Sequence, residues 1–144
     1  MLAIAAACLI SLPGPVTQPF APDGPYAGHW GVDIAVDSGA IVESPLDGVV
    51  SFAGSVVGVR TVTVRQGAFR VSLSYLSAID AVAGQAVRRG DPVGRAGAPH
   101  GIPGLHIGVR RGDVYVDPVD VSRCRSGGTI RLLPPMLGGL VHKD

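Results

Sequence analysis

Two neighbouring segments of the chain alternate polar and apolar residues, and this alternation limits the possible folds more than any other feature. Residues 61–65 and 69–75 both alternate, and the Gln66-Gly67 pair between them is typical of a tight hairpin turn. No window holds an amphipathic helical pattern longer than about ten residues, the length at which helical periodicity becomes persuasive. We therefore expect an all-β domain of short antiparallel strands with negligible helix.

The composition supports one packed domain. The 21 glycines and 12 prolines alone would be typical of disorder, but 47% hydrophobic residues indicate a turn-rich fold with a core. A chain of 144 residues can bury such a core without disulfide bonds or structural metal ions. We expect a leader-like segment at 1–24, the main domain at 25–122 and a tail at 123–144. The net charge of +1 gives no reason to expect a nucleic-acid partner.

Residues 2–12 form an apolar run that is too short to cross a bilayer, which takes about 20 residues. The run is typical of a signal-peptide core, although a charged start and a clear cleavage site are missing. We expect a secreted or envelope-associated protein without a stable membrane span, released without its first dozen or so residues. Two alternatives remain open, a lipid on Cys8 and an unprocessed apolar arm packed on the domain.

Three further segments carry expectations of their own. The proline-rich residues 13–27 should be extended without a regular strand ladder. Cys8 and Cys124 are the only cysteines, so neither a disulfide framework nor a cysteine-type zinc site is predicted. Residues 126–144 could add one edge strand before a mobile end.

Two distant segments would place polar side chains on one face of an extended strand. If residues 28–35 are extended, His29 and Asp33 share a face and their apolar neighbours take the other. The same count on residues 104–108 separates His106 from apolar neighbours. Glycines near both histidines leave room for another group to approach the backbone. Two histidines and one aspartate form a three-ligand set with a fourth position open, as a catalytic zinc ion requires.

The same segments resemble the lysostaphin/LytM-type zinc metallopeptidases, which cut peptidoglycan cross-links. The resemblance extends over about residues 25–120 and is carried by residues 28–35, 39–50 and 82–94, followed by Leu105-His106. It implies the antiparallel, sandwich- or barrel-like fold of the duplicated hybrid motif. It also implies that residues at positions 29, 33 and 106 hold one Zn²⁺ ion and that the protein acts in a bacterial envelope.

The chain departs from this family at two catalytic positions. Relatives normally carry one histidine two residues before the last zinc ligand and another in a Tyr-x-His-Leu-Ser strand. Here these positions are Gly104 and Tyr75. A phenol can donate a hydrogen bond at neutral pH but is a poor base, so Tyr75 can only assist. His100, in a loop of glycines and prolines, could lie over the metal as a replacement base. The alternatives are an ordinary aromatic strand residue and an exposed loop histidine.

Three functions remain open. The first is a monomeric zinc endopeptidase acting on peptidoglycan peptides. The second is a catalytically impaired relative that binds the cell wall or activates a partner wall hydrolase. The third, a sugar-phosphotransferase domain of similar topology, needs a pair of histidines, for which His100 and His106 are the candidates. A biotinyl or lipoyl carrier is excluded because the lone lysine, Lys143, lies in the tail. The intact ligand set favours the first function, and the residues at positions 75 and 104 favour the second.

Overall fold

The computed structural model describes residues 8–123. Its elements in chain order are β1 (Val16–Gln18), β2 (Ala21–Asp23), β3 (Ala27–His29), β4 (Val32–Ile34), β5 (Ile41–Glu43), β6 (Gly48–Val56), β7 (Val59–Gln66), β8 (Phe69–Ser74), β9 (Leu76–Ile79), β10 (Ala86–Val87), β11 (Pro92–Ala96), the 3₁₀ turn η1 (Pro99–Gly101), β12 (Leu105–Arg111), β13 (Val114–Val116) and α1 (Pro118–Ser122). The two helical segments cover three and five residues. The expected all-β fold is confirmed.

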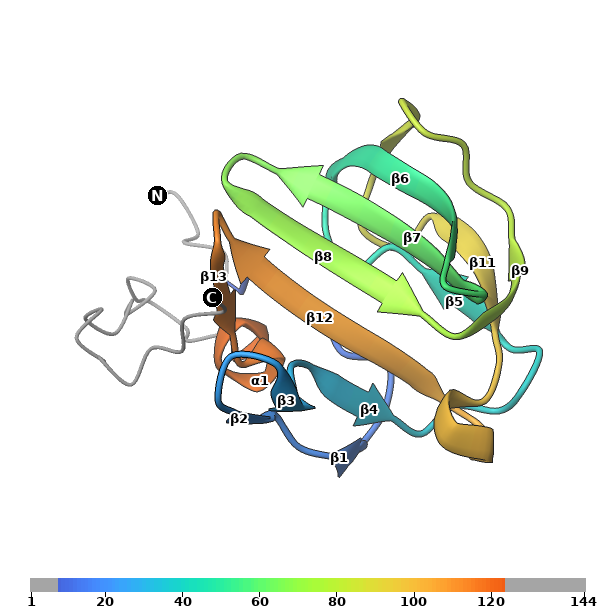
Figure 1. The fold of residues 1–144 in the computed structure, drawn as a ribbon. Helices are drawn as coiled ribbons and strands as arrows, with labels where there is room; N and C mark the ends of the chain where they lie inside the picture. Colours follow the sequence, from blue (N-terminus) through green and yellow to red (C-terminus); the bar gives the residue numbers. More distant parts are fainter. Residues whose placement is uncertain (1–7, 124–144) are drawn as a thin grey trace, which may run out of the picture.

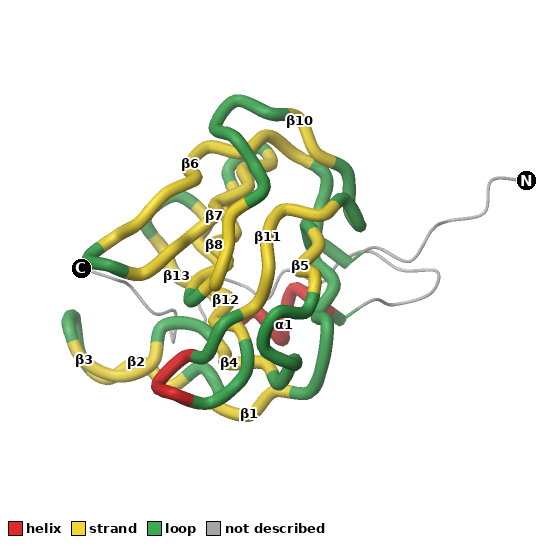
Figure 2. Tube along the Cα trace, turned by 90° about the vertical axis from the view of Figure 1, so that its right-hand side faces the viewer, coloured by secondary structure: helices red, strands yellow, loops and turns green. Residues whose placement is uncertain are grey.

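The strands form one large and two small antiparallel sheets. The main sheet has the order β1-β4-β12-β8-β7-β6-β10, with β13 paired to β12, and the smaller sheets are β5-β11-β9 and β2-β3. Figure 1 shows β12, β8 and β7 running side by side as the long strands of the main sheet. In Figure 2, β5 and β11 lie to one side of these strands. The fold therefore has two layers, with one face of the main sheet covered and the other open.

The core lies between the two layers because the long strands alternate. The inward side chains of the main sheet are fully or almost fully buried, and they pack with residues of β5, β9 and β11 in one cluster: Val62, Val64, Val71, Leu73, Leu105, Ile107 and Val109. The outward side chains of the same strands are mostly polar. The predicted hairpin is present, but Gln66 pairs with Phe69, so its turn residues are Gly67 and Ala68.

The proline-rich lead-in contains two short strands, β1 and β2, and the first residue of β3, so the expectation that it lacks a ladder was wrong. Strand β1 pairs with β4, and β2 pairs with β3 in a separate hairpin. Each of these strands has only three residues. Pro22 lies within β2, where its missing N–H is tolerated because a two-stranded hairpin consists only of edges.

The segment before this lead-in packs on the domain. Ile10 is fully buried in the main core. The N–H groups of Leu9 and Ile10 donate to the Val121 carbonyl at 3.0 and 3.2 Å. The Arg89 guanidinium donates to the carbonyl oxygens of Cys8 and Leu9 at 3.0 and 2.8 Å. Residues 8–10 are thus packed on the domain, as in the alternative of an unprocessed apolar arm. Export of the protein stays a prediction.

Cys8 is disulfide-bonded, which sequence reasoning did not predict. A sulfur atom in a disulfide cannot also carry a lipid, so this bond argues against the lipid alternative. Within residues 8–123, no helix is long and apolar enough to cross a membrane. The edge strand expected in residues 126–144 and the start of the apolar run lie outside the described residues.

Candidate metal centre

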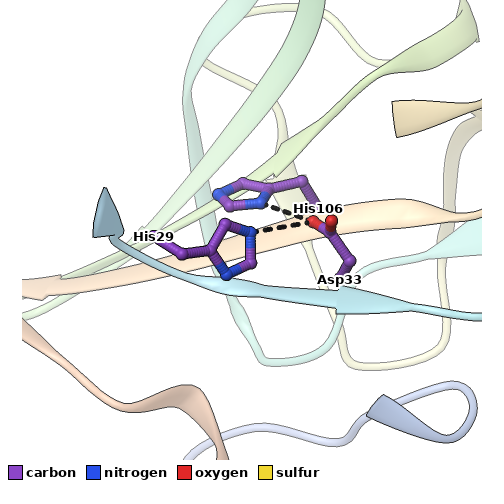
Figure 3. A group of neighbouring side chains, drawn as sticks. All are labelled: His29, Asp33 and His106. Atoms are coloured by element: carbon purple, nitrogen blue, oxygen red, sulfur yellow. Dashed lines mark hydrogen bonds and ion pairs between the residues drawn. The ribbon is translucent and has the colours of Figure 1, made fainter. Parts of the chain in front are cut away.

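Three side chains converge where β4 and β12 lie side by side. His29 ends β3, Asp33 is the middle residue of β4 and His106 lies near the start of β12. The register pairs His106 directly with Asp33. One nitrogen or oxygen atom from each of the three side chains lies within 4.8 Å of the others, and Figure 3 shows both imidazoles turned toward the carboxylate. The main sheet thus brings together residues that are far apart in the sequence.

The carboxylate of Asp33 is the centre of this cluster. Its Oδ1 atom lies 3.2 Å from His29 Nε2 and 2.8 Å from His106 Nδ1. The Asp33 side chain is only 9% exposed, whereas the two imidazoles are 17% and 22% exposed. The cluster therefore has a buried base and an accessible side.

The hydrogen bonding of His29 fits a metal ligand. Its Nδ1 lies 2.8 Å from the carbonyl oxygen of Pro19, which can only accept, so Nδ1 carries the proton. In the neutral imidazole, Nε2 then presents a lone pair to Asp33 Oδ1. Two lone pairs face each other favourably only with a cation or a proton between them. Ligand atoms around a tetrahedral zinc ion lie roughly 3.3 Å apart, close to the 3.2 Å between His29 Nε2 and Asp33 Oδ1.

Burial favours the neutral form of the His106 imidazole, which is the form that binds metal. Burial lowers the pKa of its imidazole, and this effect exceeds the opposing hydrogen bond and charge of Asp33. A lowered pKa favours the neutral ring, whose nitrogen lone pair is free to coordinate. All three side chains thus fit a divalent cation such as zinc.

Gly31 makes this geometry possible because another group approaches its backbone closely, as predicted for the glycines near the histidines. A Cβ atom on Gly31 would collide with the Ile107 carbonyl and lie 2.7 Å from His106 Nε2. At Gly104 a Cβ would lie 2.5 Å from the Ile34 carbonyl. The neighbouring strand, rather than a ligand, takes the space beside both glycines. Residues 30 and 31 also separate β3 from β4, so the single extended strand expected over residues 28–35 was wrong.

The structure places the other two candidate residues beside the cluster. His100 Nε2 lies 4.0 Å from Asp33 Oδ2, and the His100 side chain is 58% exposed. The Tyr75 ring centroid lies 5.6 Å from that of His100 and 6.5 Å from that of His106. Both residues have positive φ angles, 68° at Tyr75 and 54° at His100. Such angles are uncommon for large side chains and often occur at functional sites.

A groove of about 620 Å³ leads away from His106 over the open face of the main sheet. Residues of β6, β7, β8, β12 and β13 line it together with Trp30, and they include Phe52, Ser72, Ser74, Gly108, Arg110 and Tyr115. Sequence reasoning did not single out this surface. The pattern that could have revealed this surface is the polar–apolar alternation of β8 and β12, which places their polar side chains on the same face of the sheet as His106.

The family of the chain follows from comparison with known proteins. Residues 27–118 match the model of Peptidase family M23, which is more than half of the chain. The chain belongs to Peptidase family M23, and the predicted resemblance to lysostaphin/LytM-type proteins is confirmed. No curated protein matches this sequence.

Three solved structures illustrate the similarity. Csd3 of Helicobacter pylori is 26% identical with a TM-score of 0.71, over 85% of this chain and 38% of that one. A Pseudomonas aeruginosa protein described as a peptidase M23 is 34% identical with a TM-score of 0.65, over 83% and 51%. Lysostaphin from Staphylococcus simulans is 20% identical with a TM-score of 0.69, over 90% and 60%, and shows the common fold. In each case the matched region is less than two thirds of the other protein.

Proposed function

We propose that the protein is a zinc metalloendopeptidase that cleaves peptide cross-links of peptidoglycan in the bacterial envelope. The observation that carries this proposal is the convergence of His29, Asp33 and His106 at the head of a groove, in a chain of Peptidase family M23. These residues would hold the zinc ion. Bound there, zinc would act as a Lewis acid toward the peptide carbonyl and make a water molecule more acidic.

The remaining chemistry falls to His100 and Tyr75. Hydrolysis of an amide needs a group that takes a proton from water and one that delivers a proton to the leaving amine. His100 is exposed beside the Asp33 carboxylate, and an imidazole can do both near neutral pH. The Tyr75 hydroxyl would donate a hydrogen bond to the oxygen that gains negative charge. In this proposal the substrate is a peptide lying in the groove, and the protein works as a monomer.

The residues at positions 75 and 104 favour a second, non-catalytic function. Gly104 and Tyr75 replace the two histidines that relatives use for catalysis. A chain that had lost hydrolysis would serve as a wall-binding module or as an activator of a partner wall hydrolase. The retained ligand set is the argument against this alternative, because such a module has no chemical need for it.

The test is a metal analysis of the purified full chain together with a digestion assay on isolated cell walls. We expect about one zinc ion per chain and zinc-dependent release of free amino groups. His106→Ala should lose both without a change in the circular dichroism spectrum, whereas His142→Ala, a histidine outside the described residues, serves as the matched control. A zinc-binding chain that releases nothing from any wall substrate would support the second function. A chain that binds no zinc would contradict the first.

A further inference from the structure

Three arginines stand side by side at the far end of the groove. Arg65 of β7 pairs with Arg70 of β8, and Arg70 pairs with Arg110 of β12. Like charges directly opposite each other destabilise a sheet. The ion pairs found within residues 8–123 involve only Asp33 and histidines, so none of them includes an arginine of this row. The row is a local excess of positive charge in a chain whose net charge is only +1.

The arginine row and the metal centre belong to the same surface. His106, Gly108 and Arg110 alternate with buried residues along β12, so all three face the groove. Arg70 and Arg110 line this groove together with His106, whereas Arg65 extends the row beyond it. Arg110 lies four positions after His106 along β12, a distance of about 13 Å at roughly 3.3 Å per strand residue. Small side chains form the floor between the two ends.

The guanidinium of Arg110 is positioned before any ligand arrives. It lies over the ring of Tyr115, with 5.7 Å from its central carbon to the ring centroid, and its side chain is half-buried. A guanidinium forms two parallel hydrogen bonds to a carboxylate, and a held side chain loses less entropy on binding. Neighbouring Arg70 adds a second positive charge at the same place.

We propose that Arg70 and Arg110 bind a carboxylate of the substrate peptide, about four residues from the bond that is cut. This inference rests on the proposed function, because it takes the metal centre as the place of cleavage. An extended peptide spans at most about 3.3–3.6 Å per residue, so four residues cover the distance between the two ends. The substrate class is therefore an anionic peptide rather than a neutral one.

Binding can be measured without cleavage because Trp30, the only tryptophan of the chain, lines the groove. The probes are two end-capped pentapeptides, four alanines followed by either glutamate or glutamine, titrated into the zinc-loaded full chain while Trp30 fluorescence is recorded. We expect the glutamate peptide to bind about tenfold or more tightly, and to lose this advantage as salt rises. Arg110→Gln and Arg70→Gln should each remove most of it. Arg60→Gln, an exposed β7 arginine away from the groove lining, is the matched control and should keep it.

Equal dissociation constants for the two peptides, or no detectable binding of either, would overturn the inference. So would an equal loss in Arg60→Gln, because a general charge effect would then suffice. The two proposals fail separately. Wall hydrolysis without preference for the glutamate peptide removes the arginine site only, whereas a clear preference in a chain that cleaves nothing removes the peptidase.

Discussion

The ligand cluster and the pair of proposed proton-handling residues lie next to each other but are held in different ways. Asp33 and His106 sit on adjacent strands in direct register, and the Asp33 side chain is 9% exposed. His100 lies on a short 3₁₀ turn with a side chain that is 58% exposed, and Tyr75 lies in the break between β8 and β9. The ligand cluster is thus part of the paired strands, whereas His100 and Tyr75 lie in connections between strands.

The two regions differ in how strongly the sheet constrains each residue. A side chain on a paired strand is held in place by the register of the sheet, whereas a side chain on a turn has fewer neighbours that fix its position. Of the two positions where we expected a family histidine, Tyr75 lies between two strands, whereas Gly104 is buried with its backbone close to the Ile34 carbonyl. We therefore call the proposed metal ligands the rigid half of the site, and the proposed proton-handling residues the replaceable half.

The largest expected effect tests the rigid half through Gly31. In Gly31→Ala the new methyl group would collide with the backbone of β12 and press on the His106 ring. We expect zinc affinity to fall by about 10- to 100-fold, as when the surroundings of a ligand are disturbed. Gly108→Ala is the matched control, since its nearest neighbour would lie 3.8 Å away. Competition titration with a zinc chelator measures both, and parent affinity in Gly31→Ala would show that the ring is not held there.

The second prediction concerns the attempt to restore a family histidine. In Gly104→His the Cβ atom would lie 2.5 Å from the Ile34 carbonyl, so the backbone must move. We expect a loss of about 1–3 kcal/mol in the free energy of unfolding and no gain in hydrolysis. Gly104→Ala should share most of this loss. Urea unfolding measures it, and an active, fully stable Gly104→His would mean that the site accepts the histidine without strain.

The replaceable half is tested by comparing His100→Ala with Tyr75→Phe. Removing a general base should lower kcat/KM by about tenfold or more, whereas removing one hydrogen-bond donor should cost less. Zinc content should be unchanged in both variants, because neither residue belongs to the ligand set. If His100→Ala cleaves wall peptides as fast as the parent, His100 is not the replacement base.

The smallest effect is expected at Asp117, which lies outside both regions. Its carboxylate caps α1 by accepting from the Val119 N–H at 2.9 Å, and burial raises its pKa above the ordinary value of 3.8. The folded state therefore binds this proton more tightly, so stability gained below about pH 4 is lost as pH rises through the folded-state pKa. Asp117→Asn keeps a good cap and should change stability at pH 7 by less than about 0.5 kcal/mol.

Urea unfolding at pH 7 and at pH 4 checks this prediction. The parent should lose more of its stability between pH 4 and pH 7 than Asp117→Asn does. Asp117→Ala, which loses the cap, should cost about 1 kcal/mol at both. A parent and an asparagine variant with the same pH dependence would show that this carboxylate is not perturbed.

The sequence predicted the features that depend on local alternation. Counting faces separated His106 from the core, and the alternation of residues 61–75 predicted the central hairpin. His29 and Asp33 do lie together, but the count that predicted this assumed one strand, which residues 30 and 31 interrupt. Features that depend on pairing between distant strands were not predictable. The Pro19 carbonyl that orients His29, the burial of Ile10 and the row formed by Arg70 and Arg110 all require the register of the sheet.

The separation of the ligands along the chain has a consequence for how the site forms. Asp33 and His106 are 73 residues apart, so they meet only after β4 has paired with β12. Closing so long a loop costs entropy before any contact offsets it, so non-local pairing of this kind is slow. The core residues behind the two strands are apolar and contribute to stability without a metal. A zinc ion would therefore bind to a chain that has already folded, so the chain should refold after chelation and then take up the metal in a separate step.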